Sequence, residues 1–144
     1  MDTAKENKNA IRVAVIDDNV QLRDMSAKQL KNSGFTLLFE ASNEQQALER
    51  ISTDGLPDVC IVEEDFVTAK LLLERHPDLN VLMSSTNDDE DSVTEMLETG
   101  VSGYVLKYAD PDEIVTAVKA LGSSKKYFSV GVSNIATEYF AKLS

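Results

Sequence analysis

Side chains suited to cation and phosphoryl chemistry follow four apolar runs of the sequence. They are Asp17, Asp18 and Asn19 after the first run, Glu63, Glu64 and Asp65 after another, Ser84, Ser85 and Thr86 after a third, and Lys107 after the last. Carboxylates are the ligands that hard cations such as Mg²⁺ prefer, while hydroxyl and ammonium groups meet phosphoryl oxygens. If the fold brings these four groups together, the sequence predicts a site for a cation and a phosphoryl group.

Five apolar, β-branched runs alternate with segments of helical period, and this alternation predicts how the groups are positioned. The runs cover residues 11–16, 35–41, 58–63, 81–85 and 101–106. Strict alternation of strands and helices gives an α/β fold with a doubly wound parallel sheet and helices on both faces. Ligands of such sheets lie beyond the carboxyl ends of the strands. The four groups are therefore expected at one edge of the sheet.

Glycine and proline mark the expected helix boundaries. Each of four glycines follows a helical stretch, where a left-handed residue is favoured; they are Gly34, Gly55, Gly100 and Gly122. Asp110, followed by Pro111, is typical of an N-cap and first turn, and predicts the start of the last helix of the alternation.

The alternation stops after Gly122. The remaining residues place Ile135, Tyr139, Phe140 and Leu143 on one helical face, with Ser133 as the expected N-cap. Such a helix either packs back on the domain or acts as a linker or partner helix. The pattern alone leaves both interpretations open.

Composition limits the function classes. The 144 residues carry a net charge of −11, which repels nucleic acid backbones, so we expect no nucleic acid contact by these residues. A lone cysteine, Cys60, lies in an apolar run and is expected to be a buried thiol, which fits a cytoplasmic protein. The polar start of the chain predicts no secretory signal, and no apolar run is long enough to predict a membrane helix.

Two stretches give the chain a resemblance to a known family. "VAVIDDN" (13–19) and "STNDDEDSVTEMLETGVSGYVLKYADPDEI" (85–114) resemble the receiver domain of bacterial two-component response regulators, of the nitrate-response (NarL-like) type. The resemblance implies a flavodoxin-like (βα)5 fold with strand order 2-1-3-4-5. It also implies phosphorylation of an aspartate at the end of the third strand, with Mg²⁺, by a partner sensor histidine kinase. The expected organisation is a flexible N-terminus at 1–10, a receiver domain at 11–122 and a linker or C-terminal helix at 123–144.

The resemblance also assigns site residues. Asp17 and Asp18 match the family's Mg²⁺-binding acids, and Glu63 falls at the position of the phosphorylated aspartate. The matching switch residues are Ser85, which senses the phosphoryl group, the aromatic Tyr104 and Lys107. The implied metal ligands are Asp17, Asp18 and Glu63.

The chain departs from the family at its centre. Glu63 replaces the phosphoacceptor aspartate, and the loop from Glu63 to Pro77 is shorter than usual and lacks the family's Met-Pro and Gly. Because glutamate is one methylene longer and transfer depends on positioning, the resemblance predicts a degenerate receiver. Asp65 is the alternative acceptor, since it lies two residues along the strand, whereas Glu64 is expected to point to the other side of the sheet.

The implied function is signalling through protein contacts rather than catalysis. In the family the contact surface is made by the fourth helix, fifth strand and fifth helix (α4-β5-α5). Homodimers through that surface or the C-terminal helix, or contact with another signalling protein, are therefore expected. The C-terminal segment resembles a linker to a helix-turn-helix output domain that is not among these residues. Two other classes fit less well: a Mg²⁺-dependent phosphatase of haloacid dehalogenase type needs Asp-x-Asp where Asn19 stands, and a flavodoxin-like phosphate binder needs a less acidic first loop.

Overall fold

The computed structural model describes residues 10–107 and 110–143. Six parallel strands form one sheet in the order β2-β1-β3-β4-β5-β6. The strands are β1 (Arg12–Ile16), β2 (Thr36–Ala41), β3 (Val59–Glu63), β4 (Val81–Ser85), β5 (Gly103–Leu106) and β6 (Tyr127–Phe128). The predicted order 2-1-3-4-5 is confirmed, and β6 extends it at the β5 edge. The N-terminal segment predicted to be flexible lies, apart from residue 10, outside the described residues.

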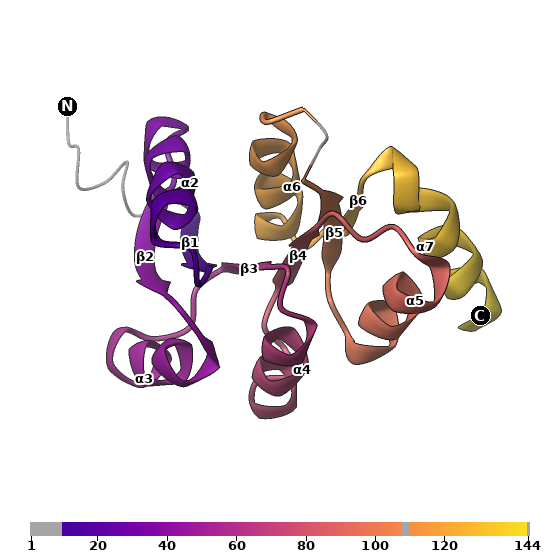
Figure 1. The fold of residues 1–144 in the computed structure, drawn as a ribbon, viewed down its shortest axis with the longest axis horizontal. Helices are drawn as coiled ribbons and strands as arrows, with labels where there is room; N and C mark the ends of the chain where they lie inside the picture. The colour runs from indigo at the N-terminus through magenta and orange to yellow at the C-terminus, as the bar shows by residue number, and fades with distance from the viewer. Residues whose placement is uncertain (1–9, 108–109, 144) are drawn as a thin grey trace.

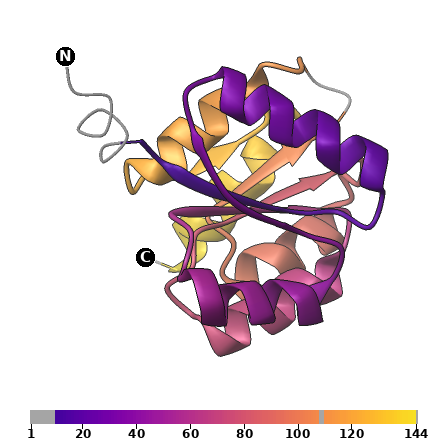
Figure 2. The ribbon, with the colours of Figure 1, turned by 90° about the vertical axis from the view of Figure 1, so that its left-hand side faces the viewer.

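Helices cover both faces of this sheet. On one face lie α2 (Val20–Asn32) and α6 (Glu113–Gly122), and on the other lie α3 (Glu44–Asp54), α4 (Phe66–Arg75) and α5 (Glu90–Thr99), as Figures 1 and 2 show. The sheet therefore separates two hydrophobic cores. The α/β doubly wound fold predicted from the alternation is confirmed.

The alternation of side chains along β1 shows how the two cores are divided. Val13 and Val15 pack in the core that includes Leu30 of α2, whereas Ala14 and Ile16 pack in the core on the opposite face. Successive residues of a strand point to opposite faces, and both faces of this sheet are covered by helices. This is why the central strand segments are apolar, and why the polar residues of interest stand where β3 and β4 end.

The helix boundaries agree with the glycine signals in three of four cases. Gly34, Gly55 and Gly100 have φ values of 93°, 91° and 108°. Gly122 differs, because it is the last residue of α6, and a Cβ added there would lie 2.5 Å from a side-chain carbon of Ile11. Close packing of α6, rather than a left-handed turn, therefore accounts for this glycine.

The start of α6 also differs from the prediction. The helix begins at Glu113 with Asp112 at the N-cap position, and Asp110 instead accepts a hydrogen bond from the backbone N–H of Asp112. Asp110 therefore orders the turn before the helix rather than capping it.

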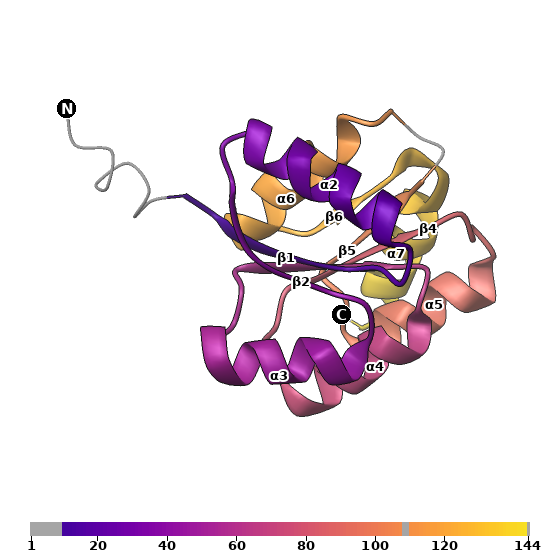
Figure 3. The same ribbon diagram turned by 60° about the vertical axis from the view of Figure 1, so that its left-hand side comes forward.

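The C-terminal segment, residues 127–143, packs on the rest of the fold. After β6, helix α7 (Val130–Leu143) begins three residues before the predicted N-cap Ser133 and lies beside α5, with Val132 and Ala136 buried in the core (Figures 1 and 3). Of the two interpretations of this helix, the structure shows packing on the domain. None of the helices in the described ranges combines the length and apolar character needed to span a membrane.

Candidate functional site

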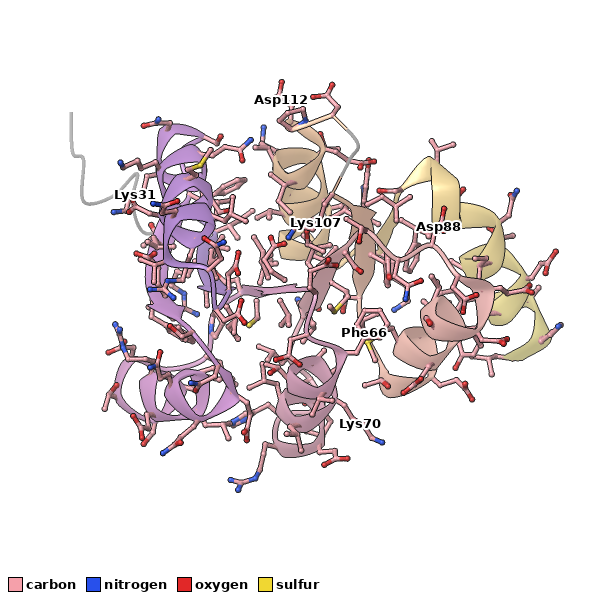
Figure 4. The ribbon with its side chains drawn as sticks, viewed as in Figure 1. Lys31, Phe66, Lys70, Asp88, Lys107 and Asp112 are labelled. Carbon is pink, nitrogen blue, oxygen red and sulfur yellow. The ribbon has the colours of Figure 1, made fainter. Side chains whose placement is uncertain are left out.

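The acids after β1 and β3 line one cavity at the carboxyl edge of the sheet. The cavity has a volume of about 430 Å³, and its lining includes Asp17, Asp18, Glu63, Glu64 and Asp65. The ends of adjacent parallel strands meet at the same edge, since Glu63 pairs in register with Ser84 of β4 and Ser85 with Leu106 of β5. The structure therefore brings together the groups that the sequence predicted to converge. Figure 4 shows Lys107 near the middle of this edge, with Phe66 below it in that view, at the start of α4.

Glu63 and Lys107 form an ion pair in the middle of the site. Lys107 Nζ lies 3.1 Å from Glu63 Oε2, and the Glu63 side chain is only 8% exposed. Opposite charges this close attract each other more strongly where burial excludes water. The glutamate side chain at position 63 thus places its carboxylate next to the ammonium group of Lys107.

Burial and charge shift the pKa values of this pair. Burial raises the pKa of Glu63, and the nearby Asp17 adds to that rise, while Lys107 and the Ser84 hydroxyl only partly offset it. For Lys107, burial on its own lowers the pKa, but Glu63, Glu64 and Asp17 more than compensate, so the pKa is raised. The ammonium form of Lys107 is therefore held in a site of converging negative charge.

The two acids after β1 have different environments. Asp17 is buried, its Oδ1 accepts a hydrogen bond from the backbone N–H of Asn19, and its carbonyl accepts one from Arg23. Asp18 is exposed. Arg23 also donates to Ser42 and lies 3.5 Å from a carboxylate oxygen of Glu40, so α2 is fixed against the ends of β1 and β2.

The predicted magnesium ligands share the cavity but do not fit a metal ion as arranged. Within residues 10–107 and 110–143, no three histidine, cysteine or acidic side chains are grouped so that they could hold a metal ion. Glu63 is committed to Lys107, which leaves Asp17 and Asp18 as the remaining acids of the predicted set. Binding of Mg²⁺ by Asp17, Asp18 and Glu63 stays a prediction.

Asp65, the alternative phosphoacceptor, caps helix α4. Its Oδ1 accepts a hydrogen bond of 3.0 Å from the backbone N–H of Thr68, and its Oδ2 accepts one of 2.7 Å from the Thr68 hydroxyl. A side-chain oxygen that satisfies the open N–H groups of a first helical turn is the usual N-cap arrangement. Only Glu64 and Asp65 separate β3 from α4. The short loop therefore uses Asp65 to begin the helix.

Glu64 reaches the end of β4, and its orientation toward the other side of the sheet from Glu63 stays a prediction. Its backbone has a left-handed φ of 60°, so the alternation of the strand ends there. Its carboxylate accepts hydrogen bonds from the backbone N–H of Thr86 at 2.9 Å and from the Thr86 hydroxyl at 3.2 Å. Burial raises the pKa of Glu64, but bonds from Ser85 and Thr86 and the charge of Lys107 outweigh it, and the pKa is lowered.

The switch residues Ser85 and Tyr104 lie next to this contact. Ser85 is buried and its hydroxyl oxygen accepts a hydrogen bond from the backbone N–H of Asn87. Tyr104 is fully buried, its hydroxyl donates to the carbonyl of Asn87, and its ring meets that of Phe66 edge-on, with centroids 6.3 Å apart. Asn87 therefore joins the hydroxyl of β4 to the aromatic ring of β5.

The structure places the predicted residues at one edge, including Thr86, which the sequence indicated by its position at the end of a strand. It also adds Asn87 and Phe66, which contribute through the contacts just described. Neither of these two residues gave a signal of its own in the sequence.

Comparison with known proteins identifies the family these features come from. The sequence model of the family described as Response regulator receiver domain matches residues 13–119. The transcriptional regulatory protein DegU of Brevibacillus brevis is 31% identical over 141 residues, covering 92% of this chain and 59% of that protein. The response regulator GacA of Pseudomonas viridiflava is 25% identical, over 83% of this chain and 58% of that protein. The chain spans about three-fifths of the length of these relatives.

Solved structures show the same fold. The receiver domain of NarL from Mycobacterium tuberculosis superimposes with a TM-score of 0.72 at 28% identity, covering 81% of this chain and 98% of that one. A LuxR-family response regulator from Aurantimonas gives a TM-score of 0.82 at 20% identity, covering 92% and 99%. The isolated receiver domain of RcsB from Salmonella enterica, solved with a phosphomimetic, gives 0.78 at 19% identity, covering 88% and 99%.

Proposed function

The chain belongs to the response regulator receiver domain family, and we propose that it is a degenerate member of the NarL/LuxR type, whose signalling does not depend on phosphorylation of its own acceptor position. The observation that carries this proposal is the ion pair between Glu63 and Lys107. A carboxylate that is 8% exposed and 3.1 Å from an ammonium group is poorly placed to attack an incoming phosphoryl group. Since such transfer depends chiefly on positioning, a misplacement of about 1 Å costs about 100-fold in rate.

The loop after β3 supports the same proposal. Asp65 is the other acid that the sequence offers as an acceptor, and its two carboxylate oxygens are engaged by Thr68 at the start of α4. Phosphorylation of Asp65 would remove that cap, which typically stabilises a protein by about 1 kcal/mol. Glu63 and Asp65, the two acids that the sequence offers as acceptors, are therefore both held by structural contacts in this chain.

We propose that the module acts through protein contacts. The partner that the family implies is a sensor histidine kinase, or another signalling protein that recognises the acid-lined edge. Three apolar side chains of α2 are exposed beside that edge, namely Val20, Leu22 and Met25. Leu22 and Met25 also line a second cavity that includes Glu63 and Lys107. An apolar border around a charged site suits a protein surface as partner.

The output surface is the second part of the proposal. The face expected for dimerisation is built here from α5, β5 and α6, and β6 and α7 now lie against it, because β6 pairs with β5 and α7 packs on α5. We propose that a homodimer or another partner would meet the surface made by this C-terminal segment. A DNA-binding output domain in a longer protein is a proposal that rests on the greater length of the relatives.

Treatment with phosphoramidate or acetyl phosphate, followed by intact mass measurement, tests the hypothesis that this receiver is not phosphorylated. We expect no phosphoryl adduct on the wild-type chain in millimolar Mg²⁺. The predicted Mg²⁺ site of Asp17, Asp18 and Glu63 is tested in the same series, because binding at 100 times Kd would stabilise the fold by about 2.7 kcal/mol and raise the melting temperature. No rise at millimolar Mg²⁺ would show that Lys107 already neutralises these acids.

Two variants complete the test. Glu63→Asp shortens the side chain at the acceptor position, and Glu63→Gln removes its charge. If either variant dimerises differently from the wild type in sedimentation experiments, and the wild type forms no adduct, a signalling role for Glu63 is supported. An adduct mapped to Glu63 or Asp65 of the wild-type chain would refute the proposal.

A further inference from the structure

The turn after β3 holds Glu64 in a backbone conformation that glutamate rarely adopts. Its φ is 60°, and the carbonyl of Glu63 accepts a hydrogen bond of 2.7 Å from the N–H of Asp65 across it. Three-residue turns with a positive φ at the central residue are rare and strained, and left-handed backbone favours glycine. A strained residue that persists at a site requires compensating contacts around it.

Those contacts come from the end of β4, with a further contribution from Lys107 after β5. The N–H of Glu64 donates to the carbonyl of Ser84 at 2.8 Å, and its carboxylate accepts from both the N–H and the hydroxyl of Thr86. The Ser85 hydroxyl and Lys107 also stabilise the charged carboxylate. A backbone N–H, two hydroxyls and an ammonium group together form a site for an anion, because every one of them presents a donor or a positive charge.

We propose that Glu64 is a built-in ligand of this anion site, occupying with its carboxylate the position where a phosphate-class oxyanion would otherwise bind to Thr86. This deepens the proposed function and rests on it: the chain supplies its own anion, so a phosphoryl group is not needed to hold the loop. Glu63 neutralises Lys107, and Glu64 engages the loop after β4. Together the two neighbouring glutamates make the contacts with Lys107 and with the loop after β4 that a single phosphoryl group would make.

The consequence extends to the buried aromatic ring. Thr86 is followed by Asn87, whose N–H donates to Ser85 and whose carbonyl accepts from the Tyr104 hydroxyl. Phe66, two residues after Glu64, packs edge-on against the Tyr104 ring. Glu64 therefore holds the loop of Thr86 and Asn87, whose carbonyl accepts from the Tyr104 hydroxyl. It also holds the turn that leads to Phe66, whose ring packs against that of Tyr104.

Amide NMR of the full chain tests the proposal, with Thr86 and Asn87 as reporters and inorganic phosphate as the anion probe. Two variants remove the carboxylate in different ways. Glu64→Gly also relieves the left-handed backbone, so it is expected to fold, and Glu64→Gln keeps the shape of the side chain. Glu90→Gln is the matched control, because it removes an exposed carboxylate at the start of α5, outside the site.

We expect the Thr86 amide to exchange about tenfold faster in Glu64→Gly than in the wild type, with a smaller increase in Glu64→Gln and none in Glu90→Gln. Phosphate, added at constant ionic strength, should shift the Thr86 resonance to saturation in Glu64→Gly and leave it unmoved in the wild type. Unchanged Thr86 exchange in both Glu64 variants would overturn the proposal. Faster exchange without a phosphate response would overturn its anion-binding part.

This outcome is separate from that of the phosphodonor experiment. A phosphoryl adduct on the wild-type chain, together with Thr86 exchange that depends on Glu64, would refute phosphorylation-independent signalling and keep Glu64 as the ligand of the loop. An absence of adduct with unchanged Thr86 exchange would do the reverse.

Discussion

Glu63 and Glu64 are neighbours in the sequence, yet their carboxylates have opposite surroundings. Burial dominates at Glu63 and raises its pKa, whereas donors from Ser85 and Thr86 and the charge of Lys107 lower the pKa of Glu64. The length of Glu63 and the backbone of Glu64 produce this difference. One side chain extends inward to Lys107, and the other turns back over the end of β4.

The two glutamates should therefore affect stability with opposite dependence on pH. Because the pKa of Glu63 is higher in the fold than in the unfolded chain, the folded state holds more protons there, and the contribution of Glu63 falls as pH rises through that interval. Glu64 has a lower pKa in the fold, so its contribution is lost as pH falls. Urea unfolding of the wild type, Glu63→Gln and Glu64→Gln at about pH 4 and about pH 7 checks both signs.

We expect the stability difference between wild type and Glu63→Gln to decrease from the lower to the higher pH, and that between wild type and Glu64→Gln to increase. The sign is the readout, since Glu64 is exposed and its effect is small. The same sign for both variants would contradict the assigned environments.

At the scale of single residues, the sequence predicted where the site residues lie in the fold better than it predicted which residues they contact. Asp17, Ser85 and Lys107 were predicted at one edge because each stands at or after the end of an apolar strand. In the structure Asp17 lines the cavity with Glu63, Lys107 pairs with Glu63, and Ser85 lies in register with Leu106 at the end of β5. The contact between Glu64 and Thr86 had no sequence signal. A positive φ is expected of glycine or asparagine, whereas here it occurs at Glu64, in the two-residue connection between β3 and α4.

At the scale of elements, the five long strands follow from apolar runs that both faces of the sheet must bury, whereas β6 does not. Its two residues, Tyr127 and Phe128, are too few to produce a periodic pattern, and their pairing with Gly103 and Tyr104 depends on the edge of β5. Gly103 makes this possible, since a Cβ there would lie 2.8 Å from the carbonyl oxygen of Tyr127. A tertiary contact, rather than a local preference, creates this strand.

Ser129 anchors the C-terminal segment to the domain. Its hydroxyl donates to Glu113 Oε1 at 2.7 Å and accepts from the backbone N–H of Leu106 at 3.0 Å, and the residue is 2% exposed. Ser129→Ala would leave the Leu106 N–H without its acceptor. An unsatisfied buried donor costs about 1–3 kcal/mol, so we expect a loss of that size in the free energy of unfolding measured with urea.

Ser133→Ala is the matched control for this anchor. Ser133 lies in the same segment, but its hydroxyl donates only to a carbonyl of its own helix, that of Val130. We expect a change within about 0.5 kcal/mol for this variant. Equal effects of the two substitutions would mean that Ser129 does not hold the segment in place.

At the scale of the whole molecule, the C-terminal segment completes the fold rather than merely following it. β6 covers the edge of β5, and Val132 and Ala136 of α7 are buried in the same core as Tyr104. An uncovered edge strand presents unpaired N–H and C=O groups that pair readily with another chain. The net charge of −11 opposes such association, because like-charged copies repel one another.

These two effects lead to a prediction for a shortened chain. Removing residues 124–144 would expose the β5 edge together with the apolar surface beneath Val132, so we expect lower stability and self-association that grows with salt, because screening weakens the repulsion between copies. Val132→Asp in the 144-residue chain places a charge at a fully buried position, so it should displace α7 while β6 stays in the sequence.

Melting temperature and sedimentation at low and high salt distinguish the contributions of β6 and α7. Self-association of the shortened chain alone would show that β6 prevents association, and self-association of both chains would show that α7 does. A shortened chain that stays monomeric at high salt with an unchanged melting temperature would show that the segment is a linker that the domain does not need.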